Sequence, residues 1–493
     1  MPTKIQSSFL LCAVLSLSCA AAQTSAPVNP AVIPTDKPDQ GWVRRHEAAV
    51  EAARTHPDTE LLLIGDSITQ NYEKANPPDE SFQPTWKEFY ESRKALNLGV
   101  SGDGTEHVRW RLLHGEVRGL HPKAVVLLIG TVNTGSFHAT AEQTEAGIDA
   151  VVGDLEQLLP TTRILLLGLL PSDISAEKTA ADRAVNAYLA RVYAEDPRVT
   201  YLDIGSIFFK DGVLDASLFY DPRLPNHPKP LHPDTVGQRR MAEAIEPTLA
   251  RLMGEPPRVP LDSIKDINTA LISVPQLEQD SYNWWARHQA ELVWQERVQP
   301  RVVLIGDSIT HFWAGNPGAN HVNGPNAWDR VFGQMPSLNL GFGWDRTQNV
   351  LWRLRQGEFE GIKPAWVVIN IGTNNLTGTD NARTNTPEEI AAAIGEIVRV
   401  VHERSSQSRI LLMGIFPRGE KPGGSMRTQI LAVNALLAQR FAHVPYVTFL
   451  DIGSHFLTAD GTLPNALFPD QTHPGEAGYA IWADALIQAG IHP

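Results

Sequence analysis

This 493-residue chain contains an internal repeat, which limits its fold more than any other feature of the sequence. Residues 61–70 return as residues 301–310, and residues 96–116 return as residues 338–358, in the same order along the chain. The apolar segments that follow also recur in the same order, so the similarity extends through both halves of the chain. A fixed-order repeat on this scale indicates duplication of a whole folding unit. The sequence therefore predicts two domains of one fold.

Each copy contains short apolar runs separated by segments of helical length. The runs 61–64, 125–129 and 164–167 lack the alternation of polar and apolar residues found in strands with one wet face. Such runs are typical of parallel strands that are buried on both faces. Helix-length segments such as 141–158 and 182–193 lie between them. This alternation of strands and helices predicts a doubly wound α/β domain, in which ligands bind at the carboxyl ends of the strands.

The domain limits follow from the repeat and from composition. We place a first domain at residues 38–254, a Pro-rich linker at 255–279 and a second domain at 280–493. Residues 1–22 are predicted to be a signal peptide, because Lys4 precedes the apolar stretch 9–17 and small alanines precede Gln23. We therefore expect export to the periplasm or the medium.

The only two cysteines, Cys12 and Cys19, lie inside this predicted leader. A cleaved product would contain no disulfide, no thiol nucleophile and no Cys-ligated zinc. An alternative is that Cys19 is a lipid-attachment site, although Ser16 stands where a larger aliphatic residue is usual. We favour simple cleavage after Ala22.

The charge balance limits the classes of partner. The formal net charge is −13, and no run of like charges resembles a nucleic-acid arm or a membrane patch. No later segment approaches the ~20 apolar residues of a membrane helix. We expect a small-molecule or carbohydrate ester as the partner, with no nucleic acid, no membrane span, no metal and no cofactor. Nothing in the residue pattern specifies an oligomeric state.

In the second copy, polar residues at predicted strand ends have the chemistry of a serine hydrolase. Ser308 follows the first strand in a Gly-Asp-Ser turn, and Asp470 and His473 lie three positions apart in a late polar loop. Asn374 follows the third apolar run. Any one of these residues alone would more often be a turn former. A serine needs a base, an acid that orients the base, and donors for the oxyanion, so the combination points to acyl transfer.

Several further blocks resemble the SGNH/GDSL hydrolase superfamily over nearly all of both copies. In the second copy, residues 349–354 (NVLWRL), 372–375 (GTNN) and 417–422 (PRGEKP) are most similar to the catalytic subunits of the intracellular platelet-activating-factor acetylhydrolases. The resemblance implies a flavodoxin-like three-layer sandwich. It also implies that Ser308 is the nucleophile, His473 the base, Asp470 its orienting acid and Asn374 an oxyanion donor.

The second copy departs from that pattern at one position. Trp344 stands before Asp345, where the relatives have a glycine whose backbone N–H contributes to the oxyanion hole. Tryptophan also has an N–H, so the role survives if the backbone does not require glycine there. The indole is then either a platform for a sugar ring, a wall that narrows the acyl pocket, or an ordinary packing residue.

The first copy departs further and is predicted to be inactive. Ser67, Gly102 and His232 match the nucleophile, the oxyanion glycine and the base. Val132 stands at the position of Asn374, and Lys229 stands three residues before His232 where the second copy has its acid.

Two other residues of the first copy are possible substitutes. Asn133 lies one position late and should face elsewhere, while Asp221 is a nearby acid that would reach His232 only if the intervening loop folds back. We expect a catalytically silent partner domain.

These patterns predict an exported serine acyl-ester hydrolase that acts on short acyl groups such as acetyl, with carbohydrate as a candidate carrier of the ester. The alternatives are O-acetyl transfer to a sugar, which uses the same serine and oxyanion hole, and a carbohydrate-binding protein without turnover. The chain has no GxSxG elbow, no P-loop and no HExxH motif. The sequence therefore gives little support for a lipase of the GxSxG type, a nucleotide-binding protein or a zinc peptidase.

Overall fold

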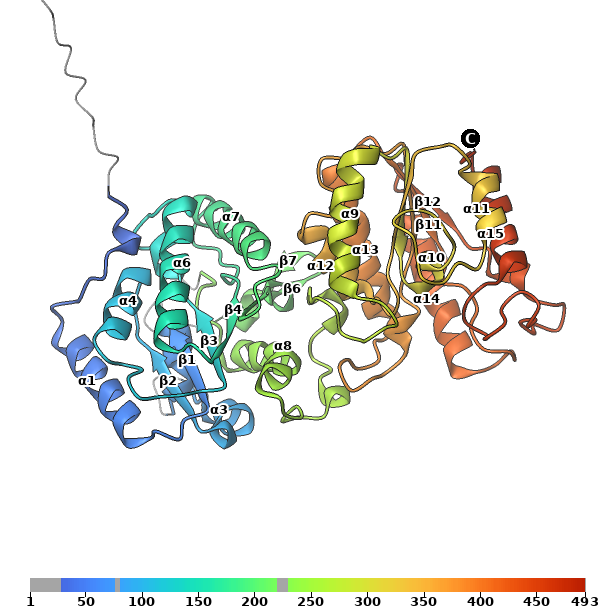
Figure 1. The fold of residues 1–493 in the computed structure, drawn as a ribbon. Helices are drawn as coiled ribbons and strands as arrows, with labels where there is room; N and C mark the ends of the chain where they lie inside the picture. The colour runs from blue at the N-terminus through green and yellow to red at the C-terminus, as the bar shows by residue number, and fades with distance from the viewer. Residues whose placement is uncertain (1–27, 76–79, 220–228, 493) are drawn as a thin grey trace, which may run out of the picture.

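Two α/β domains follow one another along the chain. The structure is a computed structural model, and it describes residues 28–75, 80–219 and 229–492. Each domain has a five-stranded parallel sheet with helices on both faces, as Figure 1 shows in blue to green for the first domain and in yellow to red for the second. The predicted fold class is confirmed. The predicted leader, residues 1–22, lies outside the described residues.

The first sheet has the strand order β2-β1-β3-β4-β5. Its strands are β1 (Leu61–Gly65), β2 (Ala95–Gly99), β3 (Ala124–Leu128), β4 (Arg163–Leu167) and β5 (Val199–Leu202). The order turns back on itself at β1, so the loops after β1, β2 and β3 meet at one edge. Ligands of open α/β sheets bind at such a switch point.

The absence of alternation in β1 is explained by the two cores that it separates. Leu61 and Leu63 face one apolar cluster, whereas Leu62 and Ile64 face the other. Helix α8 (Thr235–Met253) packs in the first cluster and α6 (Ala141–Leu158) in the second. Both faces of β1 are therefore buried in apolar cores, as the uninterrupted apolar run in its sequence predicts.

The remaining helices complete the layers of the first domain. They are α1 (Gln40–Thr55), α2 (Ser67–Gln70), α3 (Gln83–Phe89), α4 (Thr105–Leu113), α5 (Thr131–Thr134) and α7 (Ala176–Val192). A small hairpin, β6 (Phe209–Lys210) and β7 (Val213–Leu214), follows β5. Helix α7 begins before the segment 182–193 that was expected, because the Ser175 side chain caps it by accepting the N–H of Lys178.

The second domain repeats this plan with the strand order β12-β11-β10-β8-β9. Its strands are β8 (Val302–Gly306), β9 (Ser337–Gly341), β10 (Trp366–Asn370), β11 (Arg409–Met413) and β12 (Val447–Leu450). Its helices are α9 (Trp284–Val298), α10 (Ser308–His311), α11 (Pro325–Val331), α12 (Thr347–Arg355), α13 (Pro387–Arg404), α14 (Ser425–Phe441) and α15 (Glu476–Gln488).

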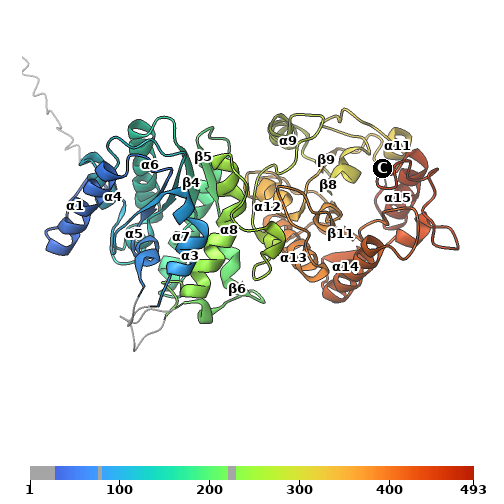
Figure 2. The same cartoon turned by 90° about the horizontal axis from the view of Figure 1, so that it is seen from below.

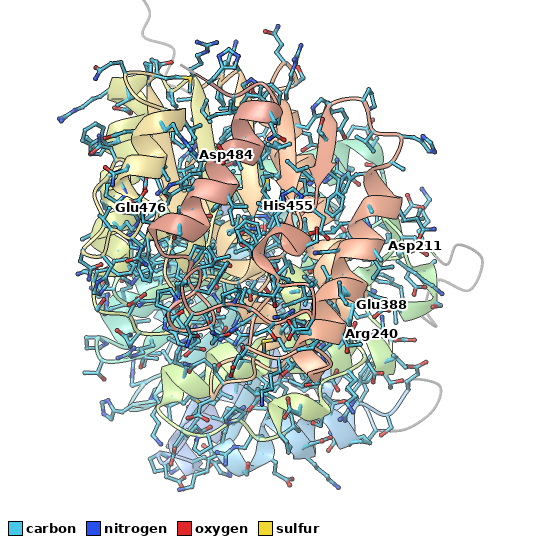
Figure 3. All side chains as sticks on the ribbon, turned by 90° about the vertical axis from the view of Figure 1, so that its right-hand side faces the viewer. Asp211, Arg240, Glu388, His455, Glu476 and Asp484 are labelled. Atoms are coloured by element: carbon cyan, nitrogen blue, oxygen red, sulfur yellow. The ribbon has the colours of Figure 1, made fainter. Side chains whose placement is uncertain are left out.

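Helix α15 closes the outer side of the second domain against α11. Figure 3 looks onto this side and labels Glu476 and Asp484 along α15. Glu476 accepts the N–H of Ala327 at 2.7 Å, and Asp484 pairs with Arg330 at 2.9 Å. Both contacts attach α15 to α11.

The predicted linker is ordered and contacts both domains. Ile264 and Ile267 are buried in a core cluster of the first domain, whereas the side chain of Asn268 donates to the carbonyl of Glu389 in α13. Asn29 makes the matching contact with Gln143 in α6 of the first domain. The structural repeat thus begins upstream of the helices at which the sequence comparison begins.

The domains meet where α7 contacts α12, near the centre of Figures 1 and 2. Arg355 at the end of α12 pairs with Asp203 after β5 at 3.6 Å. Within the described ranges, no helix is both long enough and apolar enough to span a bilayer.

Candidate active site

Ser308 lies at the first position of α10, directly after β8. The preceding Asp307 caps this short helix by accepting the N–H of Ile309 at 2.9 Å. A Cβ on Gly306 would collide with Thr310 and with the carbonyl of Asn370, so the sharp strand-to-helix turn requires a glycine. The turn places the serine hydroxyl at the carboxyl end of the sheet, where the sequence predicted it.

The structure brings Ser308, His473 and Asp470 into one chain of hydrogen bonds. Ser308 Oγ lies 2.8 Å from His473 Nε2, and His473 Nδ1 lies 2.7 Å from Asp470 Oδ2. The other carboxylate oxygen of Asp470 accepts the N–H groups of Thr472 and His473 at 2.9 and 2.7 Å. This geometry can transfer the serine proton to the imidazole while the carboxylate fixes the tautomer.

The carboxylate of Asp470 is held in its ionised form. Burial acts to raise its pKa, but hydrogen bonds from the backbone and ring of His473 outweigh this and bring the pKa below its usual value. An ionised acid on Nδ1 favours a histidine whose Nε2 accepts the serine proton.

Three residues that line one pocket each have an N–H group that can donate to an oxyanion. These groups are the N–H of Ser308, the N–H of Trp344 and the side-chain amide of Asn374. One hydrogen of the Asn374 amide is directed to the carbonyl of Asp345 at 3.0 Å, which fixes the orientation of the amide and leaves its second hydrogen available.

The backbone at Trp344 has the conformation that usually requires glycine. Its φ is +65°, and the matching Gly102 of the first domain has φ +75°. A left-handed conformation costs an L-residue roughly 1–2 kcal/mol. Trp344 thus keeps the turn and its N–H at an energetic cost, and its indole is 40% exposed on the pocket rim.

A buried ion network anchors the loop that carries Trp344. Asp345 accepts from Trp284 Nε1 and from Arg353 Nε, both at 2.8 Å, and Arg353 also pairs with Glu358. Burial raises the pKa of Asp345 to about 6. Tyr282 adds a further support, because its hydroxyl accepts the N–H of Gly343 at 2.9 Å.

The same network recurs in the first domain. Asp103 accepts from Trp42 Nε1 at 2.8 Å and from Arg111 Nε at 2.9 Å, and Arg111 pairs with Glu116. The contacts that anchor this loop are therefore the same in both copies. The differences between the copies lie in the residues that face the pocket.

The pocket in front of Ser308 has a volume of about 420 Å³ and is lined mainly by polar residues, with Phe312 and Trp344 as aromatic members. Sequence reasoning did not assign several of the side chains that form it. These are Asp280, Ser281, Phe312, His321, Asn323, Arg418 and Thr472. Arg418 belongs to the 417–422 block that carries the family resemblance, and its Nε donates to Thr472 Oγ1 at 3.2 Å. That block was the signal that could have identified Arg418.

In the first domain, Ser67 Oγ lies 2.8 Å from His232 Nε2, which repeats the pairing of the second domain. Val132 occupies the position of Asn374 and has no amide to donate. Lys229 Nζ donates to the carbonyl of Ile174 at 2.7 Å. Asp221, the candidate acid, lies outside the described residues.

Asn133 does not replace the missing amide. Its Oδ1 accepts the N–H of Thr105 at 3.0 Å, just as Asn375 accepts the N–H of Thr347 at 2.9 Å in the second domain. Both asparagines therefore serve at the beginning of a helix, as the position of Asn133 in the sequence predicts. In the described ranges, no three His, Cys, Asp or Glu side chains gather as a metal site would require.

Comparison with protein families agrees with the duplication and with the geometry. The model of the GDSL-like lipase/acylhydrolase family matches residues 63–240 and again residues 304–481. The chain belongs to this family. As a GDSL-like acylhydrolase with acetylhydrolase relatives, the protein is an ester-hydrolysing enzyme.

Individual relatives of this GDSL-like enzyme include two acetylhydrolase subunits. The platelet-activating factor acetylhydrolase IB subunit alpha1 of Bos taurus is 34% identical over 203 residues, which cover 41% of this chain and 80% of the relative. The alpha2 subunit of Rattus norvegicus is 34% identical over 197 residues, covering 40% and 79%.

Solved structures with similarity to this chain include a GDSL-like lipase from Bacteroides thetaiotaomicron and an acetylxylan esterase from Geobacillus stearothermophilus. The first is 20% identical with a TM-score of 0.34, covering 42% of this chain and 97% of the other. The second is 22% identical with a TM-score of 0.32, covering 38% and 93%.

Proposed function

We propose that this enzyme is an exported serine esterase whose second domain hydrolyses short acyl esters, with acetylated carbohydrate as the substrate class. The observation that carries the proposal is the continuous hydrogen-bond chain from Ser308 through His473 to Asp470. Export rests on the leader-like residues 1–22 of the sequence.

In the proposed mechanism, Ser308 Oγ attacks the ester carbonyl while His473 Nε2 takes its proton. The oxyanion that forms accepts hydrogen bonds from the N–H groups of Ser308 and Trp344 and from the Asn374 amide. His473 then gives the proton to the leaving alcohol, and an acyl-enzyme remains. Water attacks this ester with His473 again as base, which releases the acid and restores Ser308.

The proposed substrate class rests on two features. The related subunits are named acetylhydrolases, which favours a short acyl group. The indole of Trp344 stands exposed beside polar side chains that include Asp280 and Asn323, a combination suited to a sugar ring with its apolar face and hydroxyl groups.

The decisive test compares Ser308→Ala with Ser67→Ala in the full-length enzyme, using 4-nitrophenyl acetate. We expect Ser308→Ala to reduce turnover to the uncatalysed background and Ser67→Ala to match the parent. If Ser308→Ala turns over ester as fast as the parent enzyme, the proposed role of Ser308 is wrong. His473→Ala should behave like Ser308→Ala, because every proton transfer passes through Nε2.

The predicted lack of activity in the first domain is tested directly by treating the full chain with a fluorophosphonate probe and identifying the labelled peptides by mass spectrometry. We expect labelling at Ser308 and none at Ser67. Stoichiometric labelling at Ser67 would show that both domains are active.

A second experiment addresses substrate and acceptor. Acetylated xylo-oligosaccharides should release acetate with a higher kcat/KM than 4-nitrophenyl butyrate releases butyrate. Appearance of newly acetylated sugar in place of free acetate would favour acyl transfer. Export is tested by fractionation and by N-terminal sequencing of the mature chain, which should begin at Gln23; a lipid-modified N-terminus at Cys19 would contradict this cleavage site.

A further inference from the structure

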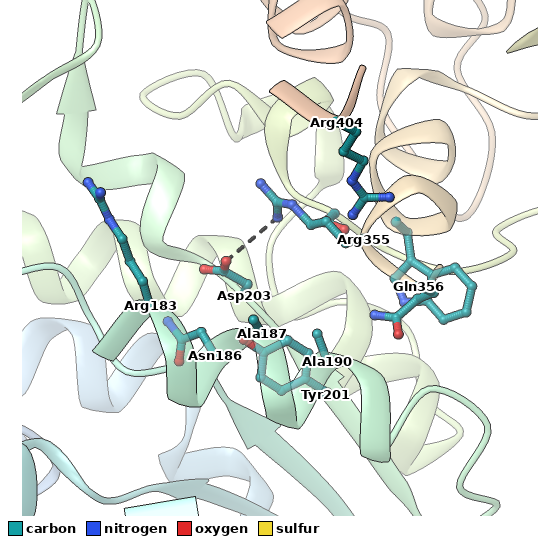
Figure 4. A pocket seen from close by; sticks show the side chains of 11 residues that line it. Arg183, Asn186, Ala187, Ala190, Tyr201, Asp203, Arg355, Gln356 and Arg404 are labelled. Atoms are coloured by element: carbon teal, nitrogen blue, oxygen red, sulfur yellow. Dashed lines mark ion pairs between the residues drawn. The ribbon is translucent and has the colours of Figure 1, made fainter. Parts of the chain in front are cut away.

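A second cavity, of about 260 Å³, lies between the two domains and apart from the serine site. The first domain contributes the outer face of α7 and the end of β5, and the second contributes the end of α12 and the end of α13. Figure 4 shows side chains from both domains converging on this space. The catalytic mechanism uses none of them.

The cavity has an excess of positive charge. Arg183, Arg355 and Arg404 line it, and Asp203 is the single carboxylate among the lining residues. Arg355 lies 3.6 Å from Asp203, the ion pair drawn as a dashed line in Figure 4. Arg404 donates to the backbone carbonyl of Glu358 at 2.7 Å, and burial lowers its pKa. No ion pair of Arg183 or Arg404 is found in the part of the chain that the structure describes.

Two buried polar atoms in the cavity wall also lack partners among the described residues. They are the hydroxyl of Tyr201, a residue that is 8% exposed, and the side-chain oxygen of Gln356, which is 7% exposed. A buried polar group without a hydrogen bond costs about 1–3 kcal/mol, so native proteins rarely retain one without a reason. Both residues line the cavity, so a small side-chain rearrangement that opens either atom to this space would let a bound ligand satisfy it.

The repeat shows that the fold does not demand these side chains. Phe449 takes the place of Tyr201 in the second domain and completes β12 without a hydroxyl. In the first domain, Leu113 and Leu158 end α4 and α6 where Arg355 and Arg404 end α12 and α13. The cations and the hydroxyl are therefore features of this cavity and not of the α/β fold.

We propose that the cavity binds a small organic anion that carries both a carboxylate and hydroxyl groups, such as a sugar acid. Guanidinium groups bind carboxylates through paired N–H donors. The oxygen of Gln356 can only accept, so it requires a donor such as a ligand hydroxyl. Trp352 supplies an apolar wall, and the volume lies below the ~300–1,000 Å³ of sites for drug-sized ligands.

The proposal is independent of the esterase assignment. Because the lining residues come from both domains, a ligand here would bind only to the assembled pair. The first domain would then have a retained role without turnover of its own.

The test is isothermal titration calorimetry of the full-length protein with D-glucuronate at low ionic strength, where exposed charges are least screened. D-glucose, acetate and inorganic phosphate serve as comparison probes. We expect saturable binding of glucuronate, no binding of glucose, and binding of acetate and phosphate weaker by at least about tenfold. Absence of glucuronate binding, or equal binding of glucose or phosphate, would overturn the proposal.

Three variants tie the binding to this cavity. Arg404→Gln should weaken glucuronate binding by at least about tenfold, and the nearly isosteric Tyr201→Phe should weaken it severalfold. Arg399→Gln is the matched control, because Arg399 lies on the same helix and pairs with Glu396 and Glu403 outside the cavity. Parent-like affinity in both cavity variants would refute the assignment, and Tyr201→Phe keeps the test valid should Arg404→Gln fail to fold.

Discussion

The left-handed backbone of Trp344 leads to a quantitative prediction about stability. Trp344→Gly and Trp344→Ala both remove the indole and its contacts, so they differ only in how well the new residue tolerates φ of +65°. The native residue already has a Cβ at this position, so alanine introduces no new clash. The comparison between the two variants therefore isolates the backbone from the side chain.

The expected difference is about 1 kcal/mol in the free energy of unfolding. An L-residue in the left-handed region costs roughly 1–2 kcal/mol. Glycine returns about 0.5–1 kcal/mol of this through its greater freedom in the unfolded chain. Trp344→Gly should therefore be more stable than Trp344→Ala. Gly102→Ala should lose a similar amount in the first domain, because its φ is +75° and an added Cβ meets only Lys37 Nζ at 3.6 Å.

Urea unfolding followed by far-UV circular dichroism provides the measurement, with Gly102→Ala as the reciprocal control. Each domain should unfold with the same slope in parent and variant, so a change in midpoint reports stability. Equal stability of Trp344→Gly and Trp344→Ala would refute the reasoning, because it would mean that the loop relaxes to negative φ without cost.

Four further outcomes are expected. Asp470→Asn should lower kcat by about 10⁴-fold, since the orienting acid fixes the tautomer of His473; a loss below tenfold would mean that another acid performs this task. Asn374→Ala should lower kcat by about 10²–10³-fold with little change in KM, and an unchanged kcat would exclude its amide as an oxyanion donor. EDTA should leave the rate unaltered; a loss that zinc restores would contradict a metal-free mechanism. Burial raises the pKa of Asp307 from 3.8 to about 7, so the free energy of unfolding should fall as pH rises from about 4 to 7, by up to about 4 kcal/mol. Asp307→Asn removes the carboxylate whose ionisation causes this loss of stability, so the variant should be more stable than the parent at pH 8 but not at pH 4. Urea titrations at both pH values measure this difference, and parallel pH profiles of stability for variant and parent would disprove the prediction.

The repeat predicted much of the fold, because the burial of each strand follows directly from the local pattern of apolar residues. The apolar runs at 61–64 and 125–129 became central parallel strands, since neither face of such a strand meets water. The order of the motifs also placed Ser308 and His473 at one sheet edge. Asn133 was predicted to point away from the pocket on the basis of one position of offset, and its bond to Thr105 agrees.

Other features depend on tertiary contacts that no local pattern contains. The glycine that the relatives have at the position of Trp344 was the one sequence signal for its positive φ, which tryptophan itself rarely adopts. The loop anchored by Asp345 holds this conformation. Tyr282 supports Gly343 from a segment far away in sequence. The cavity between the domains depends on how α7 meets α12, and neither helix alone indicates it.

Helix α12 begins beside the oxyanion loop and ends at the cavity between the domains. It has nine residues, from Thr347 to Arg355, and is therefore about 13.5 Å long at 1.5 Å per residue. Arg353, near its end, is bonded back to Asp345 in the loop just before the helix, and this ion pair attaches the helix to that loop. If a ligand in the cavity changes the affinity of the serine site, thermodynamic reciprocity requires that substrate change the affinity of the cavity by the same factor.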